Sequence, residues 1–311
     1  MFRRDVLACL AAAPSAAAIL GLGLPSSSAI AWAEGEPTRP PGSSPLVISV
    51  VGSDDGGARS APRTYDTINA AVAAACAAVS GDSASGPPDA VVIRVAPGTY
   101  RERVVVPSSL AGLLTVEGSG SGTSPGVVIV EHRTSAPYEA TFEAAPGCTG
   151  LVLRNLTIRH ASPSVANNQA VFATDGAGVR LERCDVSSET GSGVVGEGAE
   201  VSVVRCKVHD CKTHGVAVYG DLLGERGAGL VEGCEVARNG QDGVLVRGGA
   251  VGKVVDNVIA SNGRFGVELV DCGDGSEVVR NTVGGSGKKA PVGFGGLTTE
   301  GDVRLSDNTT S

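Results

Sequence analysis

Short triplets with alternating hydrophobic and polar positions recur along the second half of this chain of 311 residues. We call the first residue of each triplet the anchor. The seven anchors are Leu156, Cys184, Cys206, Cys234, Asn257, Asn281 and Asn308. Successive anchors are separated by 28, 22, 28, 23, 24 and 27 residues. A repeat of this length is typical of a solenoid.

A glycine followed by alternating aliphatic residues accompanies four of the anchors. These glycines are Gly193, Gly215, Gly243 and Gly266, and each lies nine residues after its anchor. We expect each to occupy a corner that needs an unusual backbone conformation. Roughly 22 residues make one closed circuit of three short strands, at about 3.3 Å per residue. The pattern therefore predicts an all-β fold, a right-handed parallel β-helix.

The composition agrees with stacked coils that have a thin aliphatic core. The chain contains 45 Gly, 42% hydrophobic residues and only 3% aromatic residues. Continuous repeats favour one elongated domain over residues 46–311. Apolar residues at helical spacing from Ile68 to Val79 predict an N-terminal capping helix, with Thr64 or Asp66 as its N-cap. Val91 is expected to begin the first strand.

The first 33 residues form a separate region. Arg3 and Arg4 precede a mildly hydrophobic stretch, and Ala31-Trp32-Ala33 offers small residues for cleavage. This region resembles a twin-arginine export signal, which predicts a periplasmic or secreted protein, with the thylakoid lumen as the alternative. A membrane anchor is less favoured because Pro14 and Pro25 interrupt the stretch. Residues 34–45 are interpreted as a linker.

The charge and the cysteines exclude several classes of partner. The net charge is −8, and removal of residues 1–33 changes it to 23 basic against 32 acidic residues, or −9. Such a chain is a poor partner for nucleic acid or, once the signal is removed, for a membrane. Cys184, Cys206 and Cys234 are predicted to form a buried thiol ladder, because they share one position on successive coils. No CxxC pair occurs, and neither a metal site nor a cofactor is predicted.

The three later anchors, Asn257, Asn281 and Asn308, predict a structural stack. Inward asparagines at one position of successive coils can bond one another and the backbone along the coil axis. His132 and His160 are interpreted as isolated surface or corner residues.

Two stretches resemble the opening of pectin methylesterases and related pectin-lyase-like proteins. They are Tyr65-Asp66-Thr67-Ile68 and the run Val95-Ala96-Pro97-Gly98-Thr99-Tyr100-Arg101-Glu102, and Gln169-Ala170-Val171 resembles the first glutamine motif of that family. The resemblance covers roughly residues 46–186 and implies the β-helix fold. The catalytic aspartates of that family have no counterpart in residues 187–191 or 213–218, which argues against esterase activity.

Residues 147–283 resemble the right-handed β-helix repeats of carbohydrate-processing proteins, periplasmic copper-maturation proteins and F-box-only proteins. The stretch from Val208 to Val216, followed by Val218-Tyr219-Gly220, is similar to the last of these. The resemblance implies the architecture alone.

The nine-residue register brings charged residues from successive coils together on one edge. It stacks His214 with Asp242, and Asp210 with Arg238. His214 and Asp242 are the candidate acid/base pair, and Arg238 or Arg264 would neutralise a uronate carboxylate. The candidate binding residues on this edge are His209, Asp210, Lys212, Tyr219 and Arg247. The alternative interpretation is that these are surface pairs across coils that favour the correct register.

Two functions remain open at this point. The first is an exported, non-catalytic β-helix protein that presents a binding face for a glycan or a protein. The second is a uronate-directed polysaccharide lyase or C5-epimerase that uses the His214 edge, so any enzymatic activity would not be that of a pectinesterase. The final anchor is followed by no evident cap, and we expect end-to-end association through the C-terminal coil, a covering partner or an incomplete chain.

Overall fold

The computed structural model describes residues 45–51, 63–81, 86–119, 127–163, 168–220, 227–287 and 290–310. The predicted export signal lies outside the described residues, as does the predicted linker except for its last residue. All described residues belong to the unit Pro37–Ser311.

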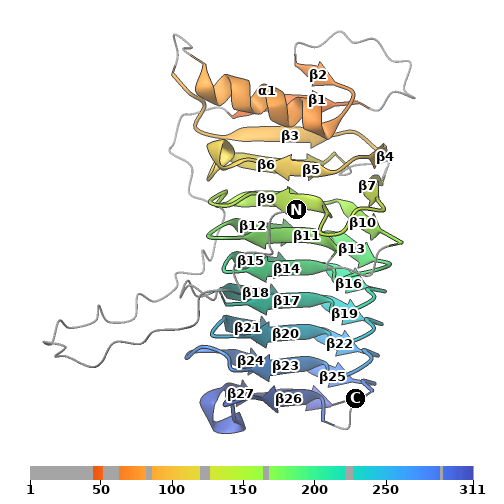
Figure 1. Cartoon of the computed structure of the whole chain (residues 1–311), viewed down its shortest axis with the longest axis vertical. Coiled ribbons are helices and arrows are strands. Elements are labelled where there is room, and N and C mark those ends of the chain that lie inside the picture. The colour runs from red at the N-terminus through yellow and green to blue at the C-terminus, as the bar shows by residue number, and fades with distance from the viewer. Residues whose placement is uncertain are drawn as a thin grey trace, which may run out of the picture. The chain divides into compact units, whose positions relative to one another are not determined.

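This unit is a right-handed parallel β-helix, as predicted, and every strand pair is parallel. Figure 1 shows the coils stacked on one another, with α1 at the end that holds the first strands. Sheet A contains, in spatial order, β2 (Thr64–Tyr65), β1 (Leu46–Val50), β3 (Val91–Val95), β6 (Leu114–Gly118), β9 (Leu151–Arg154), β12 (Gly178–Glu182), β15 (Glu200–Val204), β18 (Ala228–Glu232), β21 (Val251–Val255), β24 (Glu277–Val279) and β27 (Arg304–Ser306).

Two further sheets complete each coil. Sheet B contains β4 (Gly98–Arg101), β7 (Val128–Arg133), β10 (Thr157–Ala161), β13 (Asp185–Ser188), β16 (Lys207–His209), β19 (Glu235–Ala237), β22 (Val258–Ala260), β25 (Thr282–Gly284) and β28 (Thr309–Thr310). Sheet C contains β5 (Val104–Val106), β8 (Ala140–Ala144), β11 (Gln169–Thr174), β14 (Val194–Glu197), β17 (Val216–Tyr219), β20 (Val244–Arg247), β23 (Val267–Val270) and β26 (Val292–Gly295). Each predicted anchor directly precedes a strand of sheet B.

The helical elements are α1 (Ile68–Ser80), η1 (Ser108–Leu110) and η2 (Glu300–Asp302). Helix α1 packs with its predicted apolar face toward the core and contacts β1, β3 and η1. Its N-cap is Thr67 rather than Thr64 or Asp66, because the Thr67 hydroxyl accepts the Ala70 N–H at 3.1 Å. The carboxylate of Glu102 accepts two more N–H groups of the first turn, from Ile68 and Asn69.

The first strand begins earlier than expected. β1 precedes α1 and pairs with β3 from Leu46↔Val91 to Val50↔Val95, so Val91 starts the third strand and not the first. The loop and helix between the two strands hide this pairing from a local pattern, because the strands are 45 residues apart.

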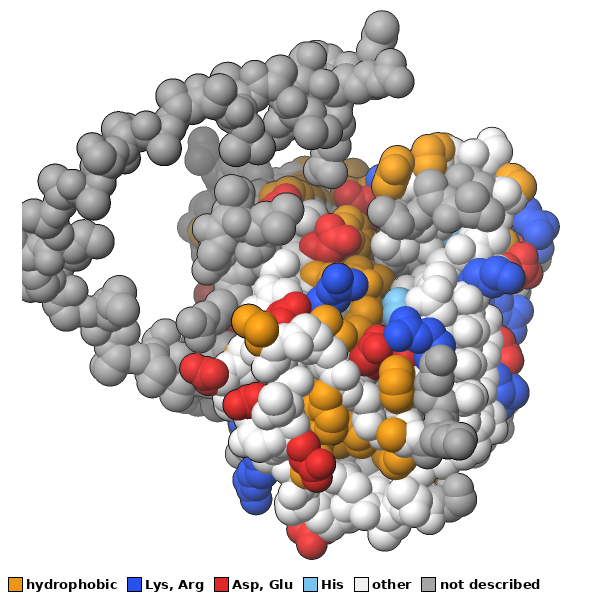
Figure 2. Space-filling view, turned by 60° about the horizontal axis from the view of Figure 1, so that its bottom comes forward, with side chains coloured by type: hydrophobic (Ala, Val, Ile, Leu, Met, Phe, Trp, Pro, Cys, Tyr) orange, Lys and Arg blue, Asp and Glu red, His pale blue; other side chains and the backbone are white. Residues whose placement is uncertain are grey.

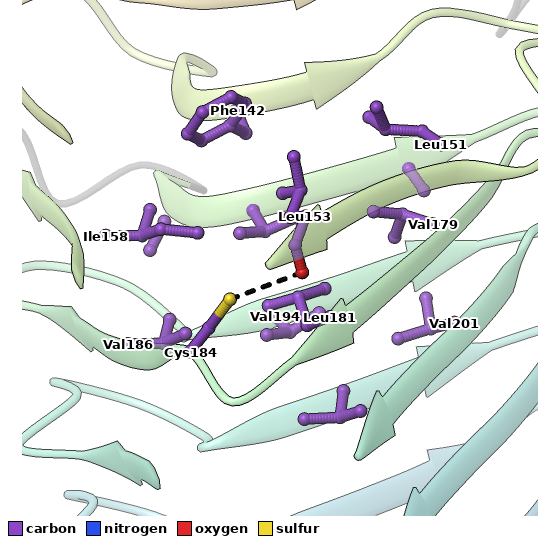
Figure 3. Close-up of a cluster of buried hydrophobic side chains, with 14 of the residues drawn as sticks. Phe142, Leu151, Leu153, Ile158, Val179, Leu181, Cys184, Val186, Val194 and Val201 are labelled. Carbon is purple, nitrogen blue, oxygen red and sulfur yellow. Dashed lines mark hydrogen bonds between the residues drawn. The ribbon is translucent and has the colours of Figure 1, made fainter. Parts of the chain in front are cut away.

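The core is a column of aliphatic side chains from all three sheets. Figure 3 shows Leu153 and Leu181 from sheet A facing Ile158 and Val186 from sheet B and Val194, at the start of β14 in sheet C. Each side chain is fully buried or nearly so. Burying one such side chain stabilises the fold by about 1.5–3 kcal/mol.

The chain turns its corners mostly with non-glycine residues in the left-handed region. Between sheets A and B, the residue before each anchor has φ between 51° and 61°: Asn155, Arg183, Arg205, Gly233, Asp256, Arg280 and Asp307. Between sheets B and C, Asp210, Arg238 and Ser261 have φ values of 53°, 56° and 57°. Such conformations are uncommon outside glycine, so the surrounding ladder must hold them.

The four glycines nine residues after the anchors have a different role from the one predicted. None of them has a positive φ. A Cβ atom on Gly215 would lie 2.7 Å from the carbonyl oxygen of Gly243 and 2.8 Å from Cγ1 of Val236. These positions require glycine because the next coil leaves no space for a side chain, and not because of the backbone conformation.

The predicted thiol ladder is confirmed. Cys184, Cys206 and Cys234 are buried and unbridged. The backbone N–H of Cys184 donates to Sγ of Cys206, and that of Cys206 donates to Sγ of Cys234, each at 3.3 Å. Side chains in this row therefore accept the N–H of the preceding coil.

The predicted asparagine stack continues the same ladder. Oδ1 of Asn257 accepts the Cys234 N–H at 2.8 Å, and Oδ1 of Asn281 accepts the N–H and the amide Nδ2 of Asn257, both at 2.9 Å. Asn308 bonds Asn281 in the same way. A second ladder, whose bonding we did not predict, runs through Cys211, Asn239 and Asn262 at the corner between sheets B and C.

His132 and His160 are not isolated, contrary to the prediction. They pair across β7 and β10, and their ring centroids are 5.7 Å apart. His132 Nε2 contacts Glu139 at 2.9 Å, whereas His160 is 1% exposed and its Nε2 has no hydrogen-bond partner among the described residues. Burial, with a smaller contribution from His132, lowers the pKa of His160 to about 4.

We expect His160 to make the stability of the protein depend on pH. Between the unfolded pKa of 6.5 and the folded pKa of about 4, the unfolded chain binds the proton and the folded chain does not. The free energy of unfolding should therefore fall as the pH decreases, by about 2 kcal/mol between pH 7 and pH 5. Denaturant titrations of the wild type and of His160→Gln measure this contribution as the difference between their pH profiles. Identical profiles would contradict it.

Candidate functional site

The outer face of sheet C carries an apolar band. Val195, Ala217 and Leu245 stand at the same position of β14, β17 and β20 and are buried. Phe172, Tyr219 and Val270 are partly buried and pack against them. Figure 2 shows hydrophobic side chains along a hollow of the surface, with acidic and basic side chains beside them.

A row of mostly polar residues runs beside this band where the strands of sheet C begin. Val171, Val194, Val216, Val244 and Val267 pair in register from β11 to β23. Two residues before each of them stand, in order, Gln169, Ser192, His214, Asp242 and Phe265. The predicted stacking of His214 beside Asp242 is therefore confirmed.

His214 and Asp242 are in direct contact. Nδ1 of His214 lies 3.0 Å from Oδ2 of Asp242 and 3.4 Å from the backbone nitrogen of Asp242. Nδ1 would accept the Asp242 N–H in one tautomer and donate to Oδ2 in the other. We assign the proton to Nδ1, because Oδ2 is buried and has no other hydrogen-bond donor among the described residues. In that tautomer Nε2 is the basic nitrogen, and no described group hydrogen-bonds it. The His214 side chain is 10% exposed, so the ring borders solvent, whereas Asp242 is fully buried.

Two further charged residues complete the cluster. The guanidinium of Arg264 lies 3.6 Å from Oδ2 of Asp242 and donates to Oε1 of Glu268 at 2.7 Å. Glu268 stands on β23, next to Leu245 of the apolar band. Oδ1 of Asp242 accepts the Phe265 N–H at 3.0 Å. The cluster therefore spans three successive coils.

The electrostatics of this cluster keep Asp242 ionised and Glu268 weakly acidic. Burial acts to raise the pKa of Asp242, but the contacts with His214 and the Phe265 N–H, together with Arg264, outweigh it and lower the pKa. Burial and the charge of Asp242 raise the pKa of Glu268, and Arg264 only partly opposes them. A buried carboxylate remains charged here because cationic and donor groups face it.

Tyr219 is the last residue of β17, five residues after His214, and packs against the apolar band. Burial and the charge of Glu197 raise the pKa of its phenol, and the charges of Asp242 and Glu268 add to the effect. Its phenol therefore keeps its proton at neutral pH. Arg247 pairs with Tyr219 in register and is exposed.

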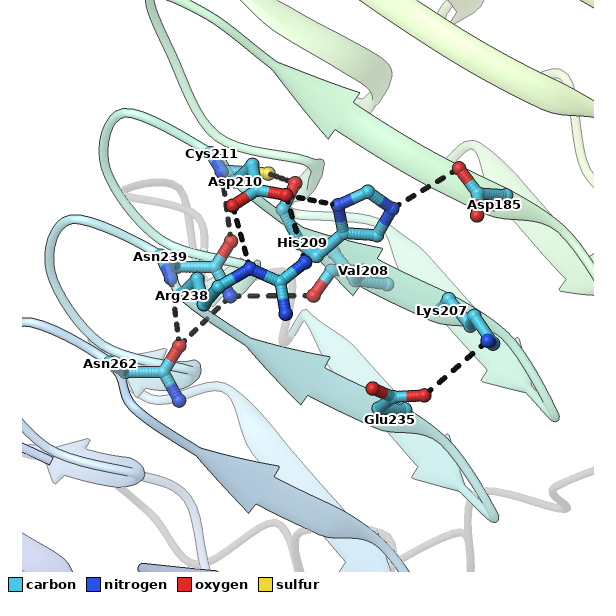
Figure 4. Close-up of polar contacts among 10 residues, drawn as sticks. All are labelled: Asp185, Lys207, Val208, His209, Asp210, Cys211, Glu235, Arg238, Asn239 and Asn262. Atoms are coloured by element: carbon cyan, nitrogen blue, oxygen red, sulfur yellow. Dashed lines mark hydrogen bonds and ion pairs between the residues drawn. The ribbon is translucent and has the colours of Figure 1, made fainter. Parts of the chain in front are cut away.

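The other predicted site residues form a separate network on sheet B. Figure 4 shows His209 between Asp185 and Asp210, and Arg238 against Asp210. His209 contacts Asp210 at 2.6 Å and Asp185 at 3.2 Å. Arg238 donates two hydrogen bonds to Asp210, each of 2.9 Å, and these bonds lower the pKa of Asp210 to about 2.

The sequence predicted that all these residues share one edge, and the structure corrects this prediction by placing them in two separate groups. No hydrogen bond or ion pair between described residues joins the sheet B network to the His214 cluster. Arg238 is engaged by Asp210 and does not contact His214 or Asp242. Lys212 is exposed at the corner between the two groups. The pairing of Asp210 with Arg238 matches the interpretation of exposed surface pairs that favour the correct register.

Glu268 is the residue that the sequence pattern did not single out. It is the only acidic residue in the triplet Val267-Glu268-Leu269, which has the same pattern as any half-buried strand. The register could have found it, since Glu268 occupies the position of Val195, Ala217 and Leu245, where the neighbouring coils are apolar.

Among the described residues, no group of three or more His, Cys, Asp or Glu side chains could hold a metal ion. No helix in the described part of the chain is long and apolar enough to cross a bilayer.

The fold and the register define a β-helix protein, and the comparisons with known proteins agree. Residues 145–310 match the family model for the right handed beta helix region, so the chain belongs to that family. A search of the curated proteins found no significant match.

Several solved structures are similar to this chain at low sequence identity. Pectin methylesterase from Aspergillus niger is 15% identical, with 88% of this chain and 87% of that chain covered and a TM-score of 0.57. Pectin methylesterase PemA from Erwinia chrysanthemi is 13% identical, with coverages of 86% and 89% and a TM-score of 0.49. The A-module of the mannuronan C-5 epimerase AlgE4 from Azotobacter vinelandii is 13% identical, with coverages of 78% and 84% and a TM-score of 0.41.

Proposed function

We propose that this protein binds an acidic polysaccharide along the outer face of sheet C and abstracts a proton from a uronate unit. The observation that carries the proposal is the contact of 3.0 Å between His214 and the fully buried Asp242. Asp242 holds the Nδ1 proton, which leaves Nε2 of His214 as a base at the border of solvent. The twin-arginine pattern at Arg3 and Arg4 supports an exported protein that meets such a polymer outside the cytoplasm.

The proposed chemistry begins at C5 of the uronate, next to the carboxylate. The C5 proton moves to Nε2 of His214, and Arg264 stabilises the negative charge that develops on the carboxylate. In elimination, the released electron pair forms the C4–C5 double bond while the C4–O4 bond breaks, and the leaving oxygen takes a proton from the Tyr219 phenol. In epimerisation, the same carbanion takes a proton from solvent on the opposite face.

A second candidate is a glycan-binding face without catalysis. The contacts of Arg264 with Asp242 and Glu268 favour it, because they occupy the guanidinium that would face the substrate carboxylate. The apolar band of Val195, Ala217 and Leu245 would serve a bound sugar chain in either case.

We expect the full chain to act on a polyuronate and not on a neutral glycan. The assay incubates the protein with polygalacturonate, polymannuronate and a neutral glucan. It follows the absorbance of unsaturated products, and deuterium uptake at C5 in heavy water. Elimination gives the first signal and epimerisation gives only the second. Binding of a polyuronate without either signal would favour the second candidate, and the absence of binding as well would contradict both.

A further inference from the structure

A cavity of about 390 Å³ lies at the corner between sheets B and C, away from the His214 cluster. Its lining residues are Arg133, Thr134, Ser135, Ser162 and Pro163. Arg133 is the last residue of β7, and the others come from the corner loops that follow β7 and β10. This cavity has no part in the chemistry proposed above.

The frame of the cavity is fixed by hydrogen bonds on both sides. The ladder between β7 and β10 ends with the Thr134 N–H donating to the carbonyl of Ala161 at 3.1 Å. The fully buried Asn168, which precedes β11, bonds the loop that follows β7. Its Oδ1 accepts the Glu139 N–H at 3.2 Å, and its Nδ2 donates to the carbonyl of Ala136 at 3.5 Å.

The lining has the chemistry of a site for an acidic sugar. Arg133 supplies a guanidinium that can bind a carboxylate through two hydrogen bonds. The hydroxyl of the exposed Ser135 suits a sugar hydroxyl, and Pro163 offers apolar surface to the ring carbons. Arg133 contacts Glu189 at 3.4 Å, and the two side chains are 75% and 69% exposed. Solvent screens so exposed a pair, so a ligand carboxylate can replace Glu189.

The position of the cavity relates it to the His214 cluster. The cavity lies between the coils of β7 and β10, and the His214–Asp242 contact lies between the coils of β16 and β19. These places are three coils apart, or about 14 Å at the spacing of neighbouring strands. Both belong to the corner between sheets B and C, and Glu189, the partner of Arg133, lies on the intervening coil of β13.

We propose that this cavity is a second binding site for a carboxylated sugar unit of the same polymer, with Arg133 as its anchoring residue. The inference rests on the proposed function, since the unit held here sets which uronate reaches His214. A chain too short to span both places occupies only one of them.

Isothermal titration of the full chain with hexagalacturonate tests this site. Arg133→Gln should weaken binding roughly tenfold, because it removes a charged hydrogen bond. Glu189→Gln should strengthen binding by about twofold to fivefold, because it removes a competing carboxylate. The matched control is Arg159→Gln, an exposed arginine of β10 that does not line the cavity, and its affinity should equal that of the wild type.

Opposite changes for Arg133→Gln and Glu189→Gln cannot arise from a general loss of folding. Equal weakening by Arg133→Gln and Arg159→Gln would overturn the proposal, as would equal binding of a neutral hexasaccharide. As a further test, digalacturonate, which is too short to span both places, is titrated into His214→Gln with and without Arg133→Gln. Adding Arg133→Gln should weaken only the binding in the cavity. If hexagalacturonate binds as expected but is not turned over, the cavity site stands and the proposed catalysis fails. Turnover with no effect of Arg133→Gln on affinity would support the catalysis and contradict the cavity site.

Discussion

His214→Gln is expected to lower kcat/KM on a polyuronate by about 10²-fold to 10⁴-fold, the range that a positioned general base contributes. Glutamine keeps a polar side chain of similar length but has no basic nitrogen to accept the C5 proton. Binding of the polymer should remain, because the apolar band of sheet C is unchanged. The measurement is steady-state turnover beside equilibrium binding, so that a loss of chemistry is separated from a loss of affinity.

Asp242→Asn should reduce turnover by a comparable factor through a different route. Oδ1 can still accept the Phe265 N–H, but the amide no longer holds the Nδ1 proton of His214 in place. His209→Gln is the matched control, since His209 lies five residues away from His214 in sequence and belongs to the sheet B network. Wild-type turnover in His214→Gln, or an equal loss in His209→Gln, would remove the His214 cluster from the mechanism.

The repeat pattern predicts most of the fold because a β-helix stacks like positions on like positions. The spacing of the anchors predicts the strands of sheet B, and the identity of the anchors predicts both the thiol ladder and the asparagine stack. Such contacts depend only on which residues occupy equivalent positions on successive coils, and the spacing of the repeats gives these positions. The start of β1 could not be predicted from the spacing of the repeats, because its partner β3 follows a helix and lies 45 residues further along the chain.

The site is harder to predict from the spacing of the repeats, because the backbone conformation at a corner decides whether a side chain lies on sheet B or beside sheet C. His209 and His214 are five residues apart, yet Asp210 turns the chain between them with a φ of 53°. His209 consequently joins carboxylates on sheet B, and His214 joins Asp242 beside the apolar band. The row alignment places Asp242 next to His214, but the charge pattern alone places Arg238 there as well. The backbone conformation at the corner separates Arg238 from His214 and Asp242.

The largest effect on stability is expected for Asn257→Ala, in the ladder that runs along the column. This change leaves the buried N–H of Cys234 and the carbonyl of Val231 without the partners that Asn257 provides at 2.8 Å each. An unsatisfied buried polar group costs about 1–3 kcal/mol, so the free energy of unfolding should fall by about 3–6 kcal/mol with the loss of packing included.

Cys206→Ala, at the equivalent position two coils earlier, is the matched comparison. Its sulfur accepts the Cys184 N–H at 3.3 Å, and sulfur is a weak acceptor. We therefore expect a smaller loss, about 1–2 kcal/mol. Because each coil contacts only its neighbours, the damage should remain near the substituted coil. Hydrogen exchange of the Cys234 amide should accelerate in Asn257→Ala before that of distant coils, and equal destabilisation by the two variants would show that the amide bonds do not hold the column together.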